Sequence, residues 1–156
     1  MKNLIILTGN IGSGKSTLAK KYQEKGYIVI ARDMLRYAIG GGNYIYNLEY
    51  ESIIFDVELE LFYRFLELDV DIIIDEIGIS KELRERYIYT AKEYNYDITS
   101  IILPKLSMNE SVNRRMINPH GQYDRKIWED VWKKFNNMYE KPCKDEGFDK
   151  IIEVKE

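Results

Sequence analysis

The chain has 156 residues, of which 45% are hydrophobic and 31% are charged, and its formal net charge at pH 7 is −3. This composition is typical of a folded globular protein and excludes intrinsic disorder. No apolar run approaches the roughly 18 to 20 residues that a membrane-spanning helix requires, so we expect no membrane partner. The negative net charge argues against extended contact with duplex nucleic acid, although a few arginines can still bind the end of one strand.

Cysteine and histidine occur once each in the chain. Cys143 is the only cysteine, so no internal disulfide can form, and we expect a reducing, cytoplasmic location. His120 is the only histidine, which excludes a metal site built from several histidines.

Short β-branched runs alternate with polar stretches of helical spacing along the chain. In order, the sequence predicts a strand at 4–8, a helix at 16–25 ending at Gly26, a strand at 27–31, helix 51–68, strand 70–75, helix 81–94, strand 98–103, helix 126–139 and strand 150–154. Helix 51–68 has apolar residues at helical spacing, including Ile54, Val57, Leu61, Phe65 and Leu68. This alternation predicts an α/β fold with a parallel sheet of about five strands and helices on both faces. Ligands of such sheets bind beyond the carboxyl ends of the strands.

A glycine-rich motif follows the first predicted strand. Residues 9–16 read Gly-Asn-Ile-Gly-Ser-Gly-Lys-Ser and match the P-loop pattern, with a strand before and a helix after. Glycines let the backbone wrap around phosphates, and the N–H groups of the loop and helix face them. We expect ATP or GTP to contact Gly9, Asn10, Ile11, Gly12, Ser13, Gly14, Lys15, Ser16 and Thr17. Lys15 would reach the β- and γ-phosphates, and the Ser16 hydroxyl would bind Mg²⁺.

The second predicted strand runs directly into Arg-Asp-Met-Leu-Arg at residues 32–36. Asp33 lies where a carboxylate can accept the proton of an attacking hydroxyl, as phosphoryl transfer to an alcohol requires. Arg36 lies one turn further along the same helix face and can hold an acceptor phosphate. The alternative is structural: Asp33 would cap a short helix beside a solvated arginine.

Two adjacent carboxylates follow the third predicted strand. Asp75 occupies the position of a Walker-B carboxylate, where it would bind Mg²⁺ through water or pair with Arg36 or Lys15. Glu76 would instead activate water if the protein were an ATPase. A capping or ion-pairing role remains open for both residues.

Two further segments carry candidate binding residues. Residues 107–125 read as a mobile flap, and a lid at about 105–126 would bring arginines over the phosphates and exclude water. Only one of Arg114 and Arg115 is expected to point inward, because adjacent helical residues diverge by about 100°. Tyr44 follows three glycines and would stack on an acceptor base or simply pack.

The order of these motifs, followed by Phe-Asn-Asn-Met-Tyr-Glu-Lys-Pro at 135–142 and Glu-Gly-Phe-Asp-Lys-Ile at 146–151, resembles the polynucleotide 5′-hydroxyl kinase family over essentially the whole chain. The resemblance implies transfer of the ATP γ-phosphate to the 5′-hydroxyl of DNA or RNA, with Asp33 as general base. It also implies that Arg36 binds the phosphate 3′ of the acceptor nucleotide and that Arg115 is the first lid arginine. The second lid position falls on His120, and Arg125 is its alternative.

We therefore expect residues 1–156 to form one P-loop kinase domain without the phosphatase domain that many relatives carry. Two other functions remain open from the residues alone. One is a kinase for a nucleoside or nucleotide, which the acidic composition favours. The other is an ATPase or nucleotide switch without a phosphoryl acceptor, for which Glu76 is the best argument. The acceptor, the choice of ATP or GTP and the oligomeric state are left undecided.

Overall fold

The structure is a computed structural model that describes residues 2–155. Its centre is a parallel five-stranded sheet in the order β2-β3-β1-β4-β5. The strands are β1 (Asn3–Thr8), β2 (Ile28–Ile30), β3 (Ile72–Ile74), β4 (Asp97–Ile102) and β5 (Lys150–Glu153). All five predicted strands are therefore confirmed, and the P-loop follows the central strand of the sheet.

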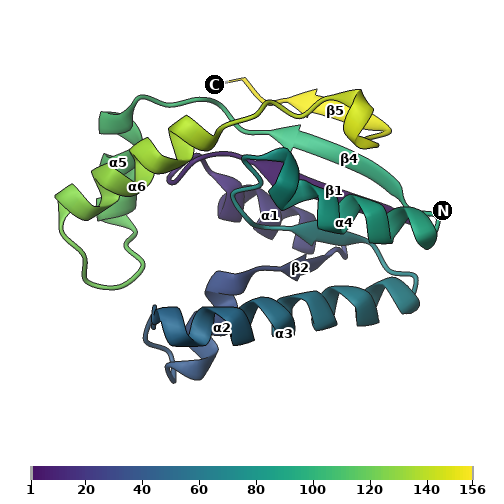
Figure 1. Ribbon diagram of the computed structural model, residues 1–156, viewed down its shortest axis with the longest axis horizontal. Helices are drawn as coiled ribbons and strands as arrows, with labels where there is room; N and C mark the ends of the chain where they lie inside the picture. The colour runs from purple at the N-terminus through teal and green to yellow at the C-terminus, as the bar shows by residue number, and fades with distance from the viewer. Residues whose placement is uncertain (1, 156) are drawn as a thin grey trace.

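The helices are α1 (Lys15–Gln23), α2 (Arg32–Ile39), α3 (Leu48–Glu67), α4 (Lys81–Glu93), α5 (Met108–Ile117) and α6 (Arg125–Met138), with a short 3₁₀ turn η1 (Lys144–Glu146). The strand arrows in Figure 1 point toward α5 and α6, which lie together at one end of the molecule. The lid helices thus sit beyond the carboxyl ends of the strands. No helix within residues 2–155 has the length and apolarity needed to span a membrane.

Helices cover both faces of the sheet, as predicted. Leu4 and Ile6 of β1 pack in a core with α3 and α4, whereas Ile5 and Leu7 pack on the opposite face with α1. This alternation follows from the two-residue period of a strand. All three residues of β3 are buried, as expected of a strand covered on both sides.

The prediction for α3 was wrong in its starting residue and in the face it implied. The helix begins at Leu48, three residues earlier than expected, because the Asn47 side chain caps it by accepting from Glu49 N–H. Its buried residues are Ile54, Glu58, Phe62 and Leu66, whereas Val57, Leu61 and Leu68 are exposed. Apolar residues occupy two sides of this helix, so their spacing alone did not identify the side that packs on the sheet.

Residues 107–125 were predicted as a flap, but ten of the residues that follow Ser107 form the regular helix α5. Ser107 caps this helix by accepting a hydrogen bond from Glu110 N–H. Val112 of α5 and Trp128 of α6 are buried in a separate small core that also contains Ile11 of the P-loop. The lid is therefore a packed helical pair connected to the phosphate loop.

The C-terminal segment is anchored by a buried ion pair. Arg84 of α4 has no exposed surface and donates two hydrogen bonds to Glu146, at 2.7 and 2.8 Å. Its third nitrogen donates to the Gly78 carbonyl at 2.7 Å. Phe148 is 3% exposed and lies in the core beside α4. The Glu-Gly-Phe-Asp motif thus holds β5 and α4 together.

Candidate active site

The P-loop is shaped to receive an anion. Gly12 and Gly14 have φ angles of 66° and 100°, in the left-handed region that favours glycine. A Cβ atom on Gly12 would lie 2.5 Å from the Ser111 carbonyl oxygen, so α5 packs directly against the loop. A Cβ atom on Gly14 would meet nothing within 4 Å, so space remains at the start of α1. This is the geometry that a phosphate-binding helix N-terminus requires.

Lys15 lies over the loop among several charged groups. Its ammonium group donates to the Asn10 carbonyl oxygen at 2.8 Å. Burial lowers the pKa of Lys15 from 10.5 to about 8, while the charge of Asp75 opposes this shift. Burial likewise raises the pKa of Asp75, against a hydrogen bond from Ser16 and the charge of Lys15. The structure therefore brings Lys15, Ser16 and Asp75 together.

The same three side chains suit a magnesium nucleotide. Mg²⁺ prefers one or two protein oxygen ligands together with water and phosphate oxygens, and Ser16 and Asp75 supply an adjacent hydroxyl and carboxylate. Within residues 2–155, no cluster of three or more acidic, histidine or cysteine side chains forms a metal site.

Asp33 lies in the first turn of α2 with its carboxylate fixed by neighbours. Its Oδ1 accepts from Arg36 at 2.7 Å and from the Tyr44 hydroxyl at 3.1 Å. Burial raises the pKa of Asp33, but the charges of His120 and Arg36 and the hydrogen bonds outweigh it and leave the pKa below 3.8. Asp33 is therefore ionised at neutral pH. The N-cap of α2 is Ala31, so the expectation that Asp33 caps this helix was wrong.

Arg36 is held from two sides. Its Nε donates to Glu51 at 3.1 Å, and a second, short hydrogen bond joins the two side chains. Its guanidinium carbon lies 5.5 Å from the centre of the Tyr46 ring. Glu51 lies 15 residues away on α3, and no sequence pattern identifies it as a partner of Arg36. Arg36 thus has one edge on Glu51 and one nitrogen on Asp33.

The two adjacent lid arginines diverge, as predicted. Arg115 points toward the site, where its charge interacts with Asp33, Lys15 and Asp75. Burial lowers its pKa, and its guanidinium carbon lies 5.3 Å from the centre of the Trp128 ring. Arg114 instead pairs with Glu110 at 3.0 Å and donates to the carbonyl oxygen of Gly12 in the P-loop at 3.4 Å.

His120 closes the site from the loop between α5 and α6. Its Nδ1 is hydrogen-bonded to the Tyr37 hydroxyl at 2.8 Å, and its Nε2 lies 3.5 Å from Asp33 Oδ2. The ring stacks on Tyr44 with a centroid distance of 5.2 Å. Burial lowers the pKa of His120 below 6.5, so the ring is neutral at pH 7. Arg125, the alternative lid residue, instead pairs within the lid with Glu129, Asn109 and Asn113.

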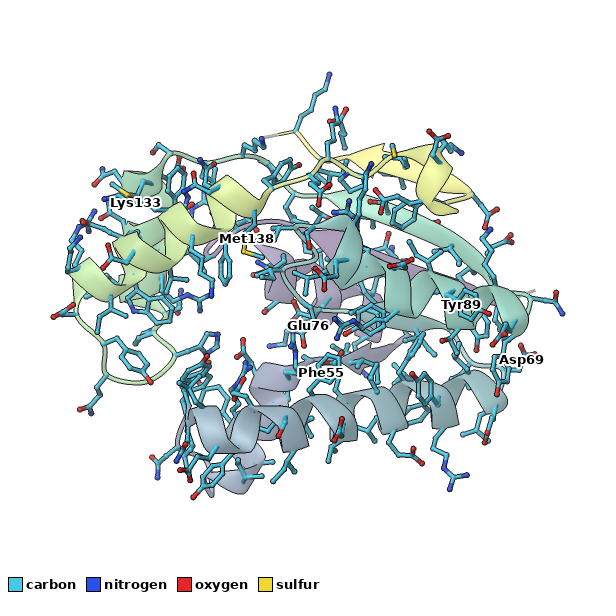
Figure 2. All side chains as sticks on the ribbon, viewed as in Figure 1. Phe55, Asp69, Glu76, Tyr89, Lys133 and Met138 are labelled. Carbon is cyan, nitrogen blue, oxygen red and sulfur yellow. The ribbon has the colours of Figure 1, made fainter. Side chains whose placement is uncertain are left out.

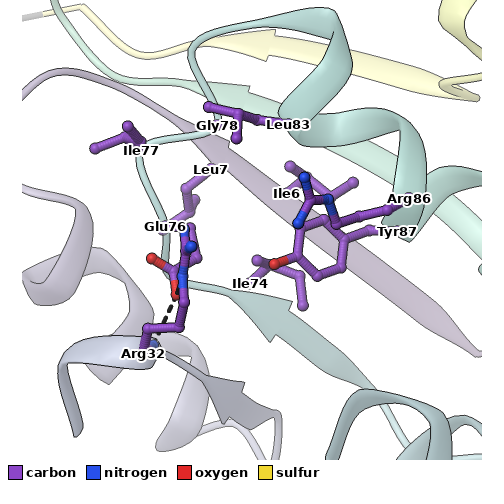
Figure 3. Close-up of a pocket in the computed structure, with 10 residues that line it drawn as sticks. All are labelled: Ile6, Leu7, Arg32, Ile74, Glu76, Ile77, Gly78, Leu83, Arg86 and Tyr87. Atoms are coloured by element: carbon purple, nitrogen blue, oxygen red, sulfur yellow. Dashed lines mark hydrogen bonds and ion pairs between the residues drawn. The ribbon is translucent and has the colours of Figure 1, made fainter. Parts of the chain in front are cut away.

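Glu76 binds the first residue of α2. Its Oε1 accepts from the Arg32 backbone N–H at 2.7 Å and from Arg32 Nε at 3.0 Å (Figure 3). Both hydrogen bonds use Oε1, so this oxygen is committed to the start of α2 and to the Arg32 side chain. Glu76 has the capping and ion-pairing role that the sequence left open.

The remaining residues that were predicted to contact the nucleotide differ in their burial and in the elements that they contact. Asn10 donates to the Trp132 carbonyl oxygen at 3.0 Å, which ties the loop to α6. Ile11 and Ser13 are buried, whereas Thr17 is exposed on α1. Gly9 N–H donates to the Ile77 carbonyl oxygen at 2.9 Å and so joins the loop to the segment after β3.

Fold and site together define a P-loop nucleotide-binding protein with a kinase-like fold. The model of the family described as AAA domain matches residues 4–142. The chain belongs to this family, and its predicted relationship to P-loop kinases is confirmed. No curated protein sequence matches the chain.

Several solved structures share the fold. A chain in the structure of a Pnkp1/Rnl/Hen1 complex is 27% identical, with a TM-score of 0.61 over 72% of this chain. Our chain spans only 38% of that longer protein. A putative kinase from Chloroflexus aurantiacus matches 98% of this chain and 87% of its own, with 15% identity and a TM-score of 0.70. An APS kinase from Mycobacterium tuberculosis, in complex with AMPPNP and APS, matches 99% and 90%, with 17% identity and a TM-score of 0.62.

Proposed function

We propose that the protein is an ATP-dependent kinase that transfers the γ-phosphate to the 5′-hydroxyl of a DNA or RNA end. The observation that carries this proposal is the placement of Asp33, whose Oδ1 accepts from Arg36 and Tyr44 and whose charge acts to raise the pKa of Lys15 against the effect of burial. A fixed carboxylate next to a phosphate-binding lysine is what proton removal from an attacking alcohol requires.

The proposal gives each residue a distinct task. Lys15 and the P-loop N–H groups would hold the β- and γ-phosphates, and Ser16 and Asp75 would bind Mg²⁺. Bound Mg²⁺ would neutralise charge on the phosphates. Asp33 would take the proton of the acceptor hydroxyl at Oδ2, because Arg36 and Tyr44 already occupy Oδ1.

Two lid residues would complete the reaction geometry. Arg115 would stabilise the charge that develops on the transferred group, as an arginine near a phosphoryl centre does. His120 lies 3.5 Å from Asp33 Oδ2 and would leave this position to the acceptor hydroxyl. Its stacking on Tyr44 supports the idea that an aromatic acceptor base can take its place on the tyrosine ring.

A small-molecule acceptor is the second candidate, and one observation favours it. Arg36 already pairs side-on with Glu51, so less of its guanidinium is available to a phosphate on the acceptor. A nucleoside without a 3′-phosphate would need no such contact. Competition between a 3′-phosphorylated dinucleotide and the matching nucleoside tests this point. Our proposal expects the dinucleotide to have the higher kcat/KM, and preference for the nucleoside would support the small-molecule kinase.

A further inference from the structure

Glu76 joins two segments that each carry a carboxylate of the proposed site. It follows Asp75 directly after β3, and it binds the backbone N–H and Nε of Arg32, the residue before Asp33. Helix α2 begins at Arg32, and its N-cap residue Ala31 supplies no capping side chain. Glu76 therefore supplies the cap that the helix lacks, from a strand end 44 residues away.

A second carboxylate approaches the same Nε of Arg32. Glu58 of α3 has no exposed side-chain surface, lies 2.9 Å from Arg32 Nε and accepts a hydrogen bond from Tyr87 of α4. Glu76 and Phe55 of α3 lie close together in the view of Figure 2, and the ring of Phe55 lies 5.8 Å from the guanidinium carbon of Arg32. We therefore expect Arg32 to keep Glu58 as an ion-pair partner when the charge of Glu76 is removed.

These contacts determine how Asp33 is placed relative to Asp75. The hydrogen bond from Arg32 N–H to Glu76 Oε1 is the direct connection between the first turn of α2 and the segment after β3. A misplacement of about 1 Å in a reacting group can lower a rate on the order of a hundredfold. We propose that Glu76 is a positioning residue that holds the proposed base Asp33 in register with Asp75 and the P-loop. This inference rests on the proposed function for its kinetic consequence, but not for its structural one.

Two conservative variants of Glu76 separate the effect of its side-chain length from the effect of its charge. Glu76→Gln keeps Oε1 in place as an acceptor for both Arg32 donors, and its amide can donate to the neighbouring Glu58. Glu76→Asp keeps the charge but is one methylene too short to reach Arg32 N–H in the same backbone position. Glu85→Ala, on the exposed side of α4, is the matched control.

If Glu76 acts by position, Glu76→Gln keeps kcat within about threefold of wild type, whereas Glu76→Asp lowers it on the order of ten- to a hundredfold. The KM for ATP changes little in both, because the P-loop is untouched. If Glu76 instead acts as a base, the order reverses and Glu76→Gln is the inactive variant. Loss of activity in both variants, or in neither, also overturns the inference.

The single histidine gives a readout that needs no acceptor. The His120 Nε2 lies 3.5 Å from Asp33 Oδ2, so the Hε1 NMR signal of this single imidazole ring and its titration report the position of that carboxylate. We expect Glu76→Asp to shift this titration and Glu76→Gln and Glu85→Ala to leave it unchanged. If wild-type protein phosphorylates no acceptor, the proposed function fails, and the histidine titration still decides the positioning role. An unshifted titration in Glu76→Asp would refute it.

Discussion

Replacement of Asp33 by asparagine removes a proton acceptor while preserving its surroundings. The asparagine carbonyl oxygen can accept from Arg36 and Tyr44, which now donate to Oδ1 at 2.7 and 3.1 Å. Arg36 also keeps its pairing with Glu51, so no unpaired charge is created. We therefore expect the folded state and nucleotide binding to be maintained in Asp33→Asn.

The expected effect on transfer is large. A positioned general base contributes about 10²- to 10⁴-fold to rate, which corresponds to about 2.7 to 5.4 kcal/mol of barrier. The loss should appear in kcat at saturating acceptor, because Asp33 acts on proton transfer in the transition state and contributes little to binding of the acceptor in the ground state. The affinity for ATP should change by less than about threefold, since Lys15 and the P-loop N–H groups are unaltered.

Both quantities can be followed in the same preparation. Initial rates of phosphoryl transfer at pH 7.5 give kcat, and titration of ATP against the fluorescence of Trp128 and Trp132, which lie in the lid beside the P-loop, gives the affinity. Thermal unfolding controls for stability. A kcat within about threefold of wild type would refute the assignment of Asp33 as the base. A large loss of ATP affinity would also contradict the reasoning.

Three further predictions concern charged residues. Lys15→Met should abolish transfer and change how the free energy of unfolding depends on pH. Burial lowers the pKa of the wild-type lysine from 10.5 to about 8, so the unfolded chain binds more protons than the folded protein between these two pH values. The free energy of unfolding of the wild type therefore rises through that range by at most about 3 kcal/mol. Denaturant titrations at pH 7.5 and 10 should show this gain in wild type but not in Lys15→Met. Glu146→Gln leaves the buried Arg84 without its anionic partner and should lower the free energy of unfolding by about 3 to 5 kcal/mol in urea titrations; an effect below about 1 kcal/mol would contradict the burial argument. Arg36→Lys replaces a planar guanidinium, which can bind a phosphate through two donors, by a single ammonium group. It should raise the KM of a 3′-phosphorylated acceptor by roughly tenfold, while the KM of a bare nucleoside stays constant.

Local patterns predicted the features of this protein that depend on neighbouring residues. The P-loop, the five strands and the polar residues after them follow from short-range spacing and from the geometry of parallel sheets. The spacing of adjacent helical residues likewise predicted that Arg114 and Arg115 would diverge. These predictions could be made because each depends on residues that lie close together in the sequence or in two consecutive elements.

Long-range side-chain pairs could not be predicted in the same way. Glu51 reaches Arg36 from another helix, and Glu76 reaches Arg32 across 44 residues. A glutamate after a strand is compatible with water activation and with helix capping, and only the direction of its side chain separates the two. The buried face of α3 was missed for a related reason, since both of its sides carry apolar residues.

The most direct test of the proposed function is the fate of the γ-phosphate of labelled ATP. Wild-type protein would be incubated with Mg²⁺ and a short 5′-hydroxyl oligonucleotide, with 3′-nucleotides, nucleosides and buffer alone in parallel. We predict label at the 5′ end of the oligonucleotide, no transfer in buffer and a rate about 10²- to 10⁴-fold lower in Asp33→Asn. Label that accumulates as inorganic phosphate at the same rate with and without acceptor would contradict it.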